Sequence, residues 1–234
     1  MTKAMQTYEA ALDTAGARAV FAVRATGDTD GPIWRMDVAL GRESAGLLPA
    51  IVTCCEAGGV ALGAITRWSV GMGPGSFTGI RVGASLAMGL VAGREARLRG
   101  LPSGLLLLGG LDVAAGERLA VLNDGRRGQA IVSRFSYGPD GFARAAEPLP
   151  VALADLPALA VDRFVLRADD PMADALPQAV RDRLTLVQTV DAAHLFAPAG
   201  FPWADDPADD AATIDPAYVR PAVFVPPAPP PLAV

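Results

Sequence analysis

Apolar and polar residues alternate along the first forty positions, a period of two that is typical of strands with one buried face. Tyr8, Ala10 and Leu12, for example, alternate with Glu9, Ala11 and Asp13. The pattern predicts three strands, at 8–13, 18–25 and 33–40. Polar, turn-forming residues separate them, so we expect consecutive antiparallel neighbours.

Helical spacing replaces this alternation over residues 43–58. Apolar side chains recur there three and four positions apart, which places them on one helix face. The members of that face are Leu47, Leu48, Ile51, Val52 and Cys55. Gly58 and Gly59 follow, and glycine commonly ends a helix. A fourth strand is predicted at 65–72 and a second helix at 76–92.

This second helix carries small residues at every fourth position. They are Gly75, Gly79, Gly83 and Ala87, so all lie on one face. A glycine inside a helix costs about 1 kcal/mol relative to alanine. The stripe therefore predicts the close approach of another backbone, as small residues permit between membrane helices. We expect a second helix there, in the same chain or in another, and 43–58 is the nearest candidate.

Turn chemistry precedes the striped helix, in Gly73, Pro74 and Gly75. Ser76 is a favoured N-cap, and the amides at a helix start can bind an anion. The P-loop lysine is missing, and the dinucleotide-binding spacing is missing too. Two interpretations stay open, a phosphate-binding loop or a structural turn beside a packing stripe, and residue chemistry favours the second.

The second half of the chain predicts shorter elements, beyond a lobe boundary near 100–116. Strands are predicted at 118–123, 129–137, 163–167 and 184–188. Helices are predicted at 101–111, 152–160, 170–178 and 191–196. Asp124 and Gly125 favour a hairpin turn. Residues 199–212 are rich in proline and aspartate and are expected to form a mobile loop.

Of the 234 residues, 51% are hydrophobic and 19% are charged, a composition that can form a sizeable core. Such a composition argues against disorder. A net charge of −5 lacks the basic signature of a stand-alone nucleic-acid-binding protein. Arg94, Arg97 and Arg99 form a small basic cluster, interpreted either as a solvated strand edge or as a contact for RNA phosphates.

Two features bear on the compartment. Cys54 and Cys55 are adjacent and cannot form an ordinary disulfide within a helix. They are therefore expected to be reduced, packed thiols, which favours the cytoplasm. No signal-peptide pattern opens the sequence, and the longest apolar run, near 105–108, is too short to span a bilayer. No membrane association is expected.

Candidate catalytic chemistry is sparse. The chain has one histidine, His194, whereas a zinc or iron site needs several converging ligands. A catalytic triad would have to use His194, and no Gly-x-Ser-x-Gly elbow is present. We therefore expect no metal, no cofactor and no catalytic residue, with His194 a packed or surface side chain.

Residues 73–83, Gly-Pro-Gly-Ser-Phe-Thr-Gly-Ile-Arg-Val-Gly, resemble the signature of the bacterial TsaB family, also called YeaZ. Residues 11–14 are similar to the opening strand and Asp-Thr turn of that family, and 215–220 to its closing proline-tyrosine-arginine motif. The resemblance spans most of the chain and is weakest in the middle. The family commonly has Asp-Ala-Arg where this chain has Asp124-Gly125-Arg126, which leaves the role of Asp124 open.

The resemblance implies an α/β chain with the actin-like ATPase fold, also called ASKHA or ribonuclease H-like. That fold has two small lobes, each a mixed sheet with flanking helices. It implies an N-terminal lobe at 1–105 and a C-terminal lobe at 106–225, followed by a proline-rich tail at 226–234.

The resemblance also implies a function without catalysis by this chain. It would bind and stabilise a TsaD-like catalytic subunit, in an assembly that also uses a TsaE-like ATPase. The assembly transfers a threonylcarbamoyl group to N6 of the adenosine next to the anticodon of tRNA. In isolation the chain would form a homodimer. The family's glycoprotease or peptidase M22-like label has no residue support, and the alternative is a small ATP-binding enzyme of the actin-like superfamily.

Two sets of candidate site residues follow. The expected partner interface consists of Leu47, Leu48, Ile51, Val52, Cys55, Ser76, Gly79, Ile80, Gly83 and Ala87. The candidate nucleotide or phosphate loop consists of Asp13, Thr14, Gly73, Gly75 and Ser76. ATP-using members of the superfamily hold an acidic residue near metal and phosphate in the turn where Asp13 falls. An equally good interpretation is a turn residue that accepts hydrogen bonds from its own backbone.

Overall fold

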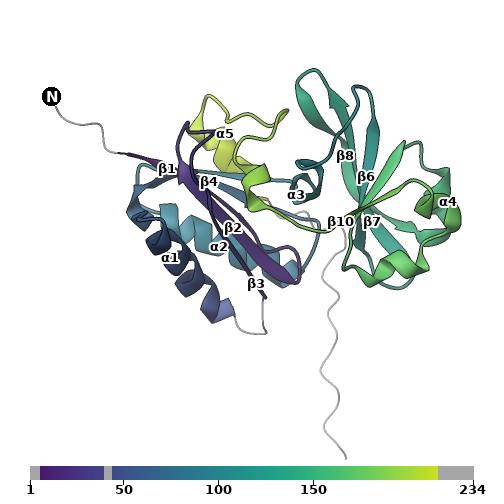
Figure 1. Ribbon diagram of the computed structural model, residues 1–234, viewed down its shortest axis with the longest axis horizontal. Coiled ribbons are helices and arrows are strands. Elements are labelled where there is room, and N and C mark those ends of the chain that lie inside the picture. The colour runs from purple at the N-terminus through teal and green to yellow at the C-terminus, as the bar shows by residue number, and fades with distance from the viewer. Residues whose placement is uncertain (1–5, 40–43, 216–234) are drawn as a thin grey trace, which may run out of the picture.

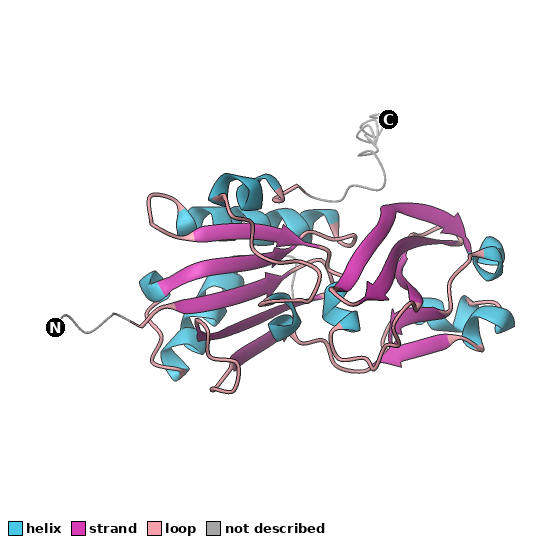
Figure 2. Ribbon diagram, turned by 90° about the horizontal axis from the view of Figure 1, so that it is seen from above, coloured by secondary structure: helices cyan, strands magenta, loops and turns pink. Residues whose placement is uncertain are grey.

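The computed structural model describes residues 6–39 and 44–215, and these form two five-stranded sheets (Figures 1 and 2). The first sheet has the order β3-β2-β1-β4-β5. Its strands are β1 (Tyr8–Asp13), β2 (Arg18–Ala25), β3 (Trp34–Ala39), β4 (Ile65–Gly71) and β5 (Arg97–Leu101). The first three are antiparallel, whereas β4 and β5 run parallel to β1, so the sheet is mixed.

The second sheet is also mixed and has the order β10-β9-β6-β7-β8. Its strands are β6 (Arg118–Asp124), β7 (Gln129–Gly138), β8 (Gly141–Ala152), β9 (Arg163–Arg167) and β10 (Leu184–Val187). The strands β6, β7 and β8 form an antiparallel meander, and β9 and β10 add in parallel. Two lobes, each with a mixed sheet and flanking helices, confirm the predicted α/β architecture.

Two long helices cover one face of the first sheet, α1 (Leu47–Ala57) and α2 (Phe77–Val91) (Figure 1). The helix α1 packs mainly on β3 and β2, and α2 on β4 and β5. Apolar residues of both helices and of all five strands form one core cluster there. Ser76 caps α2 by accepting a hydrogen bond from the amide of Gly79, as its N-cap position predicts.

The opposite face of the first sheet packs on α3 (Leu105–Leu108) and on the 3₁₀ helix η5 (Ala192–Leu195). The outer layer of the second sheet consists of η3 (Leu153–Ala158), η4 (Pro171–Ala175) and α4 (Gln178–Arg181). Single 3₁₀ turns η1 (Ser44–Gly46) and η2 (Leu62–Ala64) complete the described elements before α2. The segments predicted as helices at 152–160, 170–178 and 191–196 are thus mostly 3₁₀ turns.

Two segments of the structure differ from what the sequence led us to expect. Residues 199–212, expected to be a mobile loop, include α5 (Pro207–Ala212), which is capped by the Asp206 side chain and packs against β5. Residues 141–152, for which no strand was predicted, form β8. Pro148 and Pro150 interrupt the strand pattern there, but β8 is an edge strand, where proline is tolerated.

The division of the chain at 105/106 stays a prediction. The structure adds that the chain returns to the first lobe at η5, which packs on β1 and β2, and continues with α5, which lies along β5. Residues 1–5, residues 216–220 of the closing motif and the proline-rich tail at 226–234 lie outside the described residues.

Candidate functional site

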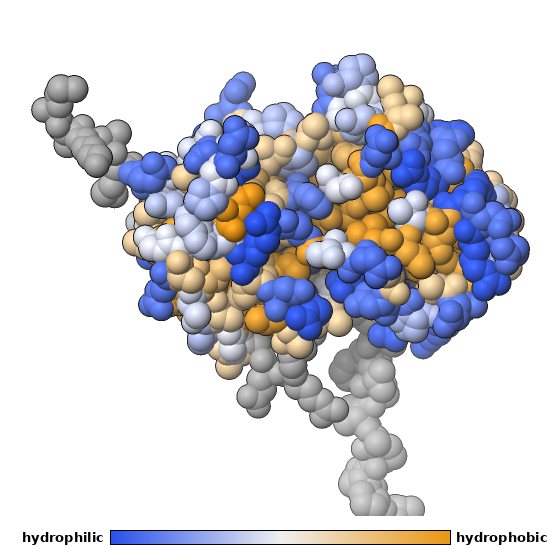
Figure 3. Space-filling view, in the orientation of Figure 1, coloured by the Kyte–Doolittle hydropathy of each residue, from blue (hydrophilic) through white to orange (hydrophobic). Residues whose placement is uncertain are grey.

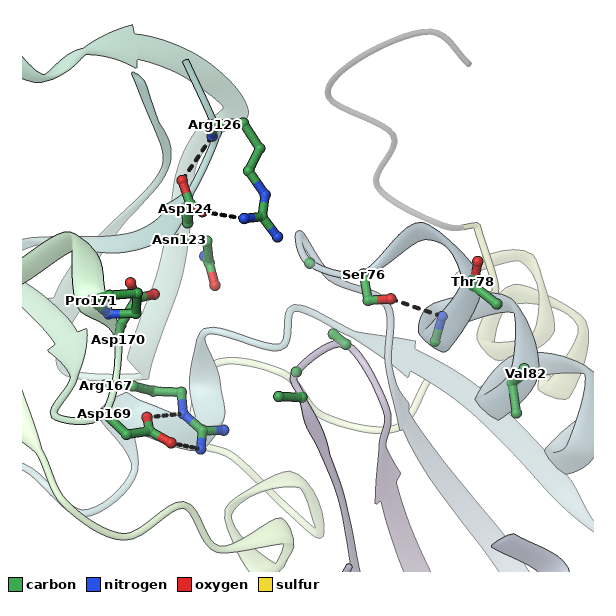
Figure 4. Close-up of a pocket in the computed structure, with 15 residues that line it drawn as sticks. Ser76, Thr78, Val82, Asn123, Asp124, Arg126, Arg167, Asp169, Asp170 and Pro171 are labelled. Atoms are coloured by element: carbon green, nitrogen blue, oxygen red, sulfur yellow. Dashed lines mark hydrogen bonds and ion pairs between the residues drawn. The ribbon is translucent and has the colours of Figure 1, made fainter. Parts of the chain in front are cut away.

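A cleft of about 850 Å³ separates the two lobes (Figure 4). The first lobe lines it with the β1–β2 turn and the start of α2, including Gly16, Gly75 and Ser76. The second lobe contributes residues at the ends of β6 and β9 and in the segments just after them. They are Asn123, Asp124, Arg126, Arg167, Asp169, Asp170 and Pro171. The structure thus brings two of the five predicted loop residues, Gly75 and Ser76, to the cleft.

Asp13 does not line this cleft but is buried behind it. One carboxylate oxygen accepts a hydrogen bond from the amide of Ala15 at 2.9 Å, and the other accepts from Ser103 Oγ at 2.5 Å. Ser103 Oγ also accepts from the amide of Gly73 at 2.9 Å. Asp13 therefore ties the end of β1 to the turn before α2 and to the segment after β5. Burial raises the pKa of Asp13 above its ordinary value of 3.8, against the opposing effect of these donors.

The first turn of α2 is bonded to the β1–β2 turn rather than open to a ligand. The amide of Ser76 donates to the carbonyl of Ala15 at 2.7 Å. The amide of Gly79 donates to Ser76 Oγ at 3.1 Å, and Thr14 Oγ1 donates to the carbonyl of Gly79 at 2.7 Å. Two amides that a bound phosphate would require are thus already used. These bonds favour the structural interpretation of the loop.

The charged side chains that line the cleft from the second lobe largely neutralise one another's charge. Arg167 makes a bidentate pair with Asp169, with both N–O distances 2.9 Å, and the exposed Arg126 pairs with Asp124 at 3.2 Å. Asp170 caps η4 by accepting from the amide of Met172. Three carboxylates thus accompany two guanidinium groups (Figure 4). Within residues 6–39 and 44–215, no three His, Cys, Asp or Glu side chains are grouped to hold a metal ion.

The turn between β6 and β7 is longer than the predicted hairpin turn at Asp124–Gly125. Arg126 and Arg127 have φ values of 62° and 54°, and Gly128 has 72°. Non-glycine residues seldom adopt this left-handed conformation. The amide of Arg126 donates to the Asp124 side chain at 2.8 Å, which helps to hold the turn. Asp124 thus has a local structural role that the sequence left open.

The glycine stripe packs on the β1–β2 turn and not, as predicted, on a second helix. A Cβ atom at Gly75 would overlap the carbonyl of Ala15, and one at Gly79 would overlap the carbonyl oxygen of Thr14. At Gly83 it would overlap the Thr14 hydroxyl. The spacing correctly predicted a close backbone approach, but the approaching backbone is a loop within the same lobe.

Most predicted interface residues face the core. Those that are buried are Leu47, Ile51, Cys55, Gly79, Ile80, Gly83 and Ala87. Leu48 is 39% exposed, Val52 is partly exposed and Ser76 lines the cleft. Phe77 and Met88 are further exposed apolar residues of α2, and neither was predicted. On the side of the first lobe where α1 is visible, apolar and polar surface alternate (Figure 3). A role of this surface in partner binding stays a prediction.

The basic cluster does not form an RNA-facing patch. Arg99 is 2% exposed and bonds backbone carbonyls, and Arg97 pairs with the buried Asp210. Only Arg94 of the three is exposed. Both interpretations offered for the cluster, a solvated edge and an RNA contact, are therefore wrong for Arg97 and Arg99. The sequence carried no signal for this, because the carbonyl acceptors lie about a hundred residues away.

His194 and the cysteines are packed side chains. His194 Nδ1 lies 2.9 Å from the carbonyl oxygen of Leu106, and the ring packs on Gly109. Cys54 and Cys55 are free and buried. Burial raises the pKa of Cys55 to about 12, which makes its thiol a poor nucleophile. No helix among the described residues has the length and apolar character needed to cross a membrane.

Replacing Asp13 by asparagine should flatten the dependence of stability on pH. The folded-state pKa of Asp13 is raised, so the protonated side chain contributes to folding stability. This contribution is complete below pH 3.8, the ordinary pKa, and is lost as pH rises through the folded-state pKa. An asparagine side chain cannot ionise, so the variant should gain stability relative to the wild type as pH rises. Urea midpoints measured between pH 4 and pH 9 test this, and a difference that falls with pH would contradict it.

The two mixed sheets, their flanking helices and the cleft between them define a two-lobed, actin-like fold. Residues 39–173, more than half of the chain, match the family model described as "TsaD: tRNA N6-adenosine threonylcarbamoyltransferase". The chain belongs to this family of tRNA-modification proteins, and within it is a TsaB/YeaZ-like member.

Solved structures support the fold assignment. YeaZ from Pseudomonas aeruginosa superposes with a TM-score of 0.68 at 21% identity, covering 91% of this chain and 99% of that chain. A second structure, an uncharacterized protein with similarity to peptidase YEAZ from Pseudomonas aeruginosa, gives 0.67 at 21% identity and covers 92% and 100%. Comparison with curated protein sequences gave no significant match.

Proposed function

We propose that this chain is a non-catalytic subunit that binds and stabilises a TsaD-like catalytic subunit. The assembly transfers a threonylcarbamoyl group to N6 of the adenosine next to the anticodon of tRNA, with a TsaE-like ATPase as a further partner. The chain reaches tRNA through the assembly, carries no cofactor of its own and acts in the cytoplasm.

The observation that carries the proposal is the placement of Asp13. An acidic residue in this turn would serve metal or phosphate only if its oxygens faced the cleft. Here both oxygens accept internal hydrogen bonds, from Ala15 and Ser103. The amides at the start of α2 are bonded within the lobe as well. In a cleft built in this way, Asp13 and these amides hold the fold together and are not available to a nucleotide.

The packed His194 also argues against hydrolysis by this chain. Its ring packs on Gly109 and Gly110, and the buried thiols of Cys54 and Cys55 are poor nucleophiles. A peptidase would need an accessible nucleophile beside a base. We therefore assign the chemistry to the TsaD-like partner and a supporting role to this chain.

The partner surface is assigned to the outer side of α1 and α2. Three of the five large apolar residues that are exposed in the described part of the chain lie on these two helices, Leu48, Phe77 and Met88, whereas the other two lie on separate strands of the second lobe. In the free chain the same surface would pair with a second copy, since a two-fold interface uses one patch twice.

Reconstitution tests the proposal. A TsaD-like subunit, a TsaE-like ATPase, tRNA and threonylcarbamoyl adenylate are combined with and without this chain, and modified adenosine is measured by mass spectrometry. Product should form at least tenfold faster with the chain present. The Asp13→Asn variant should support the reaction as well as the wild type does, because Asp13 only organises the fold. Equal product with and without the chain would refute the proposal.

The volume of the cleft is the one observation that favours the alternative, a small ATP-binding enzyme. Isothermal titration of the isolated chain with Mg-ATP separates the two functions. The subunit proposal requires no saturable heat at millimolar ATP, whereas an ATP-binding enzyme requires it.

A further inference from the structure

A continuous apolar layer joins the two lobes. Its centre is α3, whose four leucines are all buried, together with Leu195 and Phe196 at the end of η5. Residues of the first sheet pack on one side of this layer, and residues of the second sheet on the other. They are Ala11, Val20, Ala22 and Leu101 from the first sheet, and Leu119, Val121, Phe135, Phe142 and Val165 from the second. Domains that share a large hydrophobic interface do not move freely against each other.

A strap formed by residues 195–213 reinforces this layer from the side of β5. Arg99 on β5 lies beneath the strap and donates to the carbonyls of Phe196 at 2.7 Å, Phe201 at 2.8 Å and Leu195 at 3.3 Å. Its Nε also donates to Ser69 at 2.9 Å. Carbonyl acceptors thus compensate a guanidinium that is almost fully buried, although burial still lowers the pKa of Arg99 to about 10.

Further contacts hold the strap along its length. The ring of Trp203 lies under the guanidinium of Arg99, at 4.1 Å from its centroid. Arg97 pairs with Asp210 and donates to the carbonyl of Ala204. At the end of the strap, Thr213 Oγ1 accepts a hydrogen bond from the amide of Gly100 at 2.6 Å. The strap is therefore fixed to the first lobe by strong charge-assisted bonds.

The same strap is bonded to the second lobe. The amide of Phe142, at the start of β8, donates to the carbonyl of Ala199 at 3.0 Å. The backbones of Gly200 and Phe142 are so close there that a Cβ atom at Gly200 would overlap the carbonyl of Phe142. One short stretch, 196–201, thus connects Arg99 in the first lobe to β8 in the second.

We propose that Arg99 and the strap lock the two lobes into one rigid body, so that the cleft has a fixed width and does not close around a ligand. Two-lobed kinases work by hinge closure, which needs an interface that can open. Here, opening would either separate β8 from the strap at Ala199 and Gly200 or pull the strap's carbonyls away from the buried Arg99. In both cases it would expose the apolar layer. This property belongs to the free chain and does not depend on the partner proposed above.

Distance measurement across the cleft tests the lock. Nitroxide labels are attached to Ser85→Cys on α2 and Asp174→Cys on η4, both exposed, and mock-labelled wild type controls for Cys54 and Cys55. Pulsed electron resonance should give one narrow distance distribution, unchanged by millimolar Mg-ATP. A broad or two-peaked distribution, or a shift with Mg-ATP, would overturn the proposal.

Two substitutions at Arg99 show whether it provides the lock. Arg99→Met removes every donor and should widen the distribution at least twofold. Arg99→Lys keeps the charge but reaches fewer carbonyls, so it should give a distance distribution of intermediate width. This variant also provides a test if the methionine variant does not fold. Arg94→Met, an exposed arginine just before β5, is the matched control and should leave the width unchanged. A narrow distribution in a folded Arg99 variant would exclude Arg99 as the lock.

Discussion

Alanine in place of Gly79 is expected to lower the free energy of unfolding by about 1–3 kcal/mol, the usual cost of overpacking. The new Cβ would overlap the carbonyl oxygen of Thr14, a backbone atom that cannot turn away as a flexible side chain can. Thr14 is itself held, because its hydroxyl donates to the carbonyl of Gly79 at 2.7 Å. The overlap should outweigh the gain of about 1 kcal/mol in helix propensity.

Gly89 provides a matched control in the same helix. A Cβ at Gly89 meets no atom within 4 Å, so Gly89→Ala should raise the free energy of unfolding by about 0.5–1 kcal/mol. Urea denaturation followed by circular dichroism measures both variants. Equal effects at the two positions would show that packing on the β1–β2 turn does not explain the stripe.

By the same geometry, a larger residue at Gly83, for example in Gly83→Leu, cannot serve as a test of partner binding. The side chain would collide with Thr14 inside the lobe, so it would unfold the chain instead of filling an external groove. Substitutions that probe the partner surface have to be made on the exposed side of α1 and α2.

Charged residues at Leu48 and Met88 are expected to abolish most of the affinity for a TsaD-like subunit. Central apolar residues of an interface commonly contribute about 2 kcal/mol or more each. Leu48→Asp and Met88→Lys together should therefore cost about 4 kcal/mol, which weakens binding about 1,000-fold. The charges suit the helix ends, since an aspartate would lie in the first turn of α1 and a lysine in the last turn of α2. The fold should thus remain intact.

Leu149→Asp and Leu186→Lys are the controls. These residues are 39% and 44% exposed, close to Leu48 and Met88, but they lie on β8 and β10 of the second lobe. Calorimetric titration with a TsaD-like subunit should show binding like that of the wild type. If the controls lose affinity and the α1–α2 variants keep it, the partner binds the second lobe. The α1–α2 variants should also shift any homodimer toward monomer in analytical ultracentrifugation.

Local sequence patterns determined most of the regular structure. The alternation at 8–13, the helical face at 47–55 and the N-cap Ser76 all predicted elements that the structure confirms. The signature at 73–83 likewise predicted the family that residues 39–173 match. These signals are local, because periodicity and capping depend on residues within one or two turns of each other.

Only the tertiary structure decided what the candidate site residues contact. Asp13 could have faced a ligand, but Ser103, ninety positions further along the chain, turns it into a buried link. The glycine stripe predicted that another segment packs closely on α2 but did not identify it. The structure shows that this segment is the turn at Thr14.

The arginines and β8 show the same limit. In the sequence, Arg97 and Arg99 belong to a basic cluster, but their hydrogen-bond acceptors lie about a hundred residues away, in the strap. No strand was predicted at β8, which contains Pro148 and Pro150, and its position at the sheet edge makes these prolines acceptable. The sequence by itself determines which residues favour burial, and which are paired with neighbours one or two turns away. Which partner satisfies a distant polar group depends on chain topology, since long-range contacts form only when the two lobes pack together.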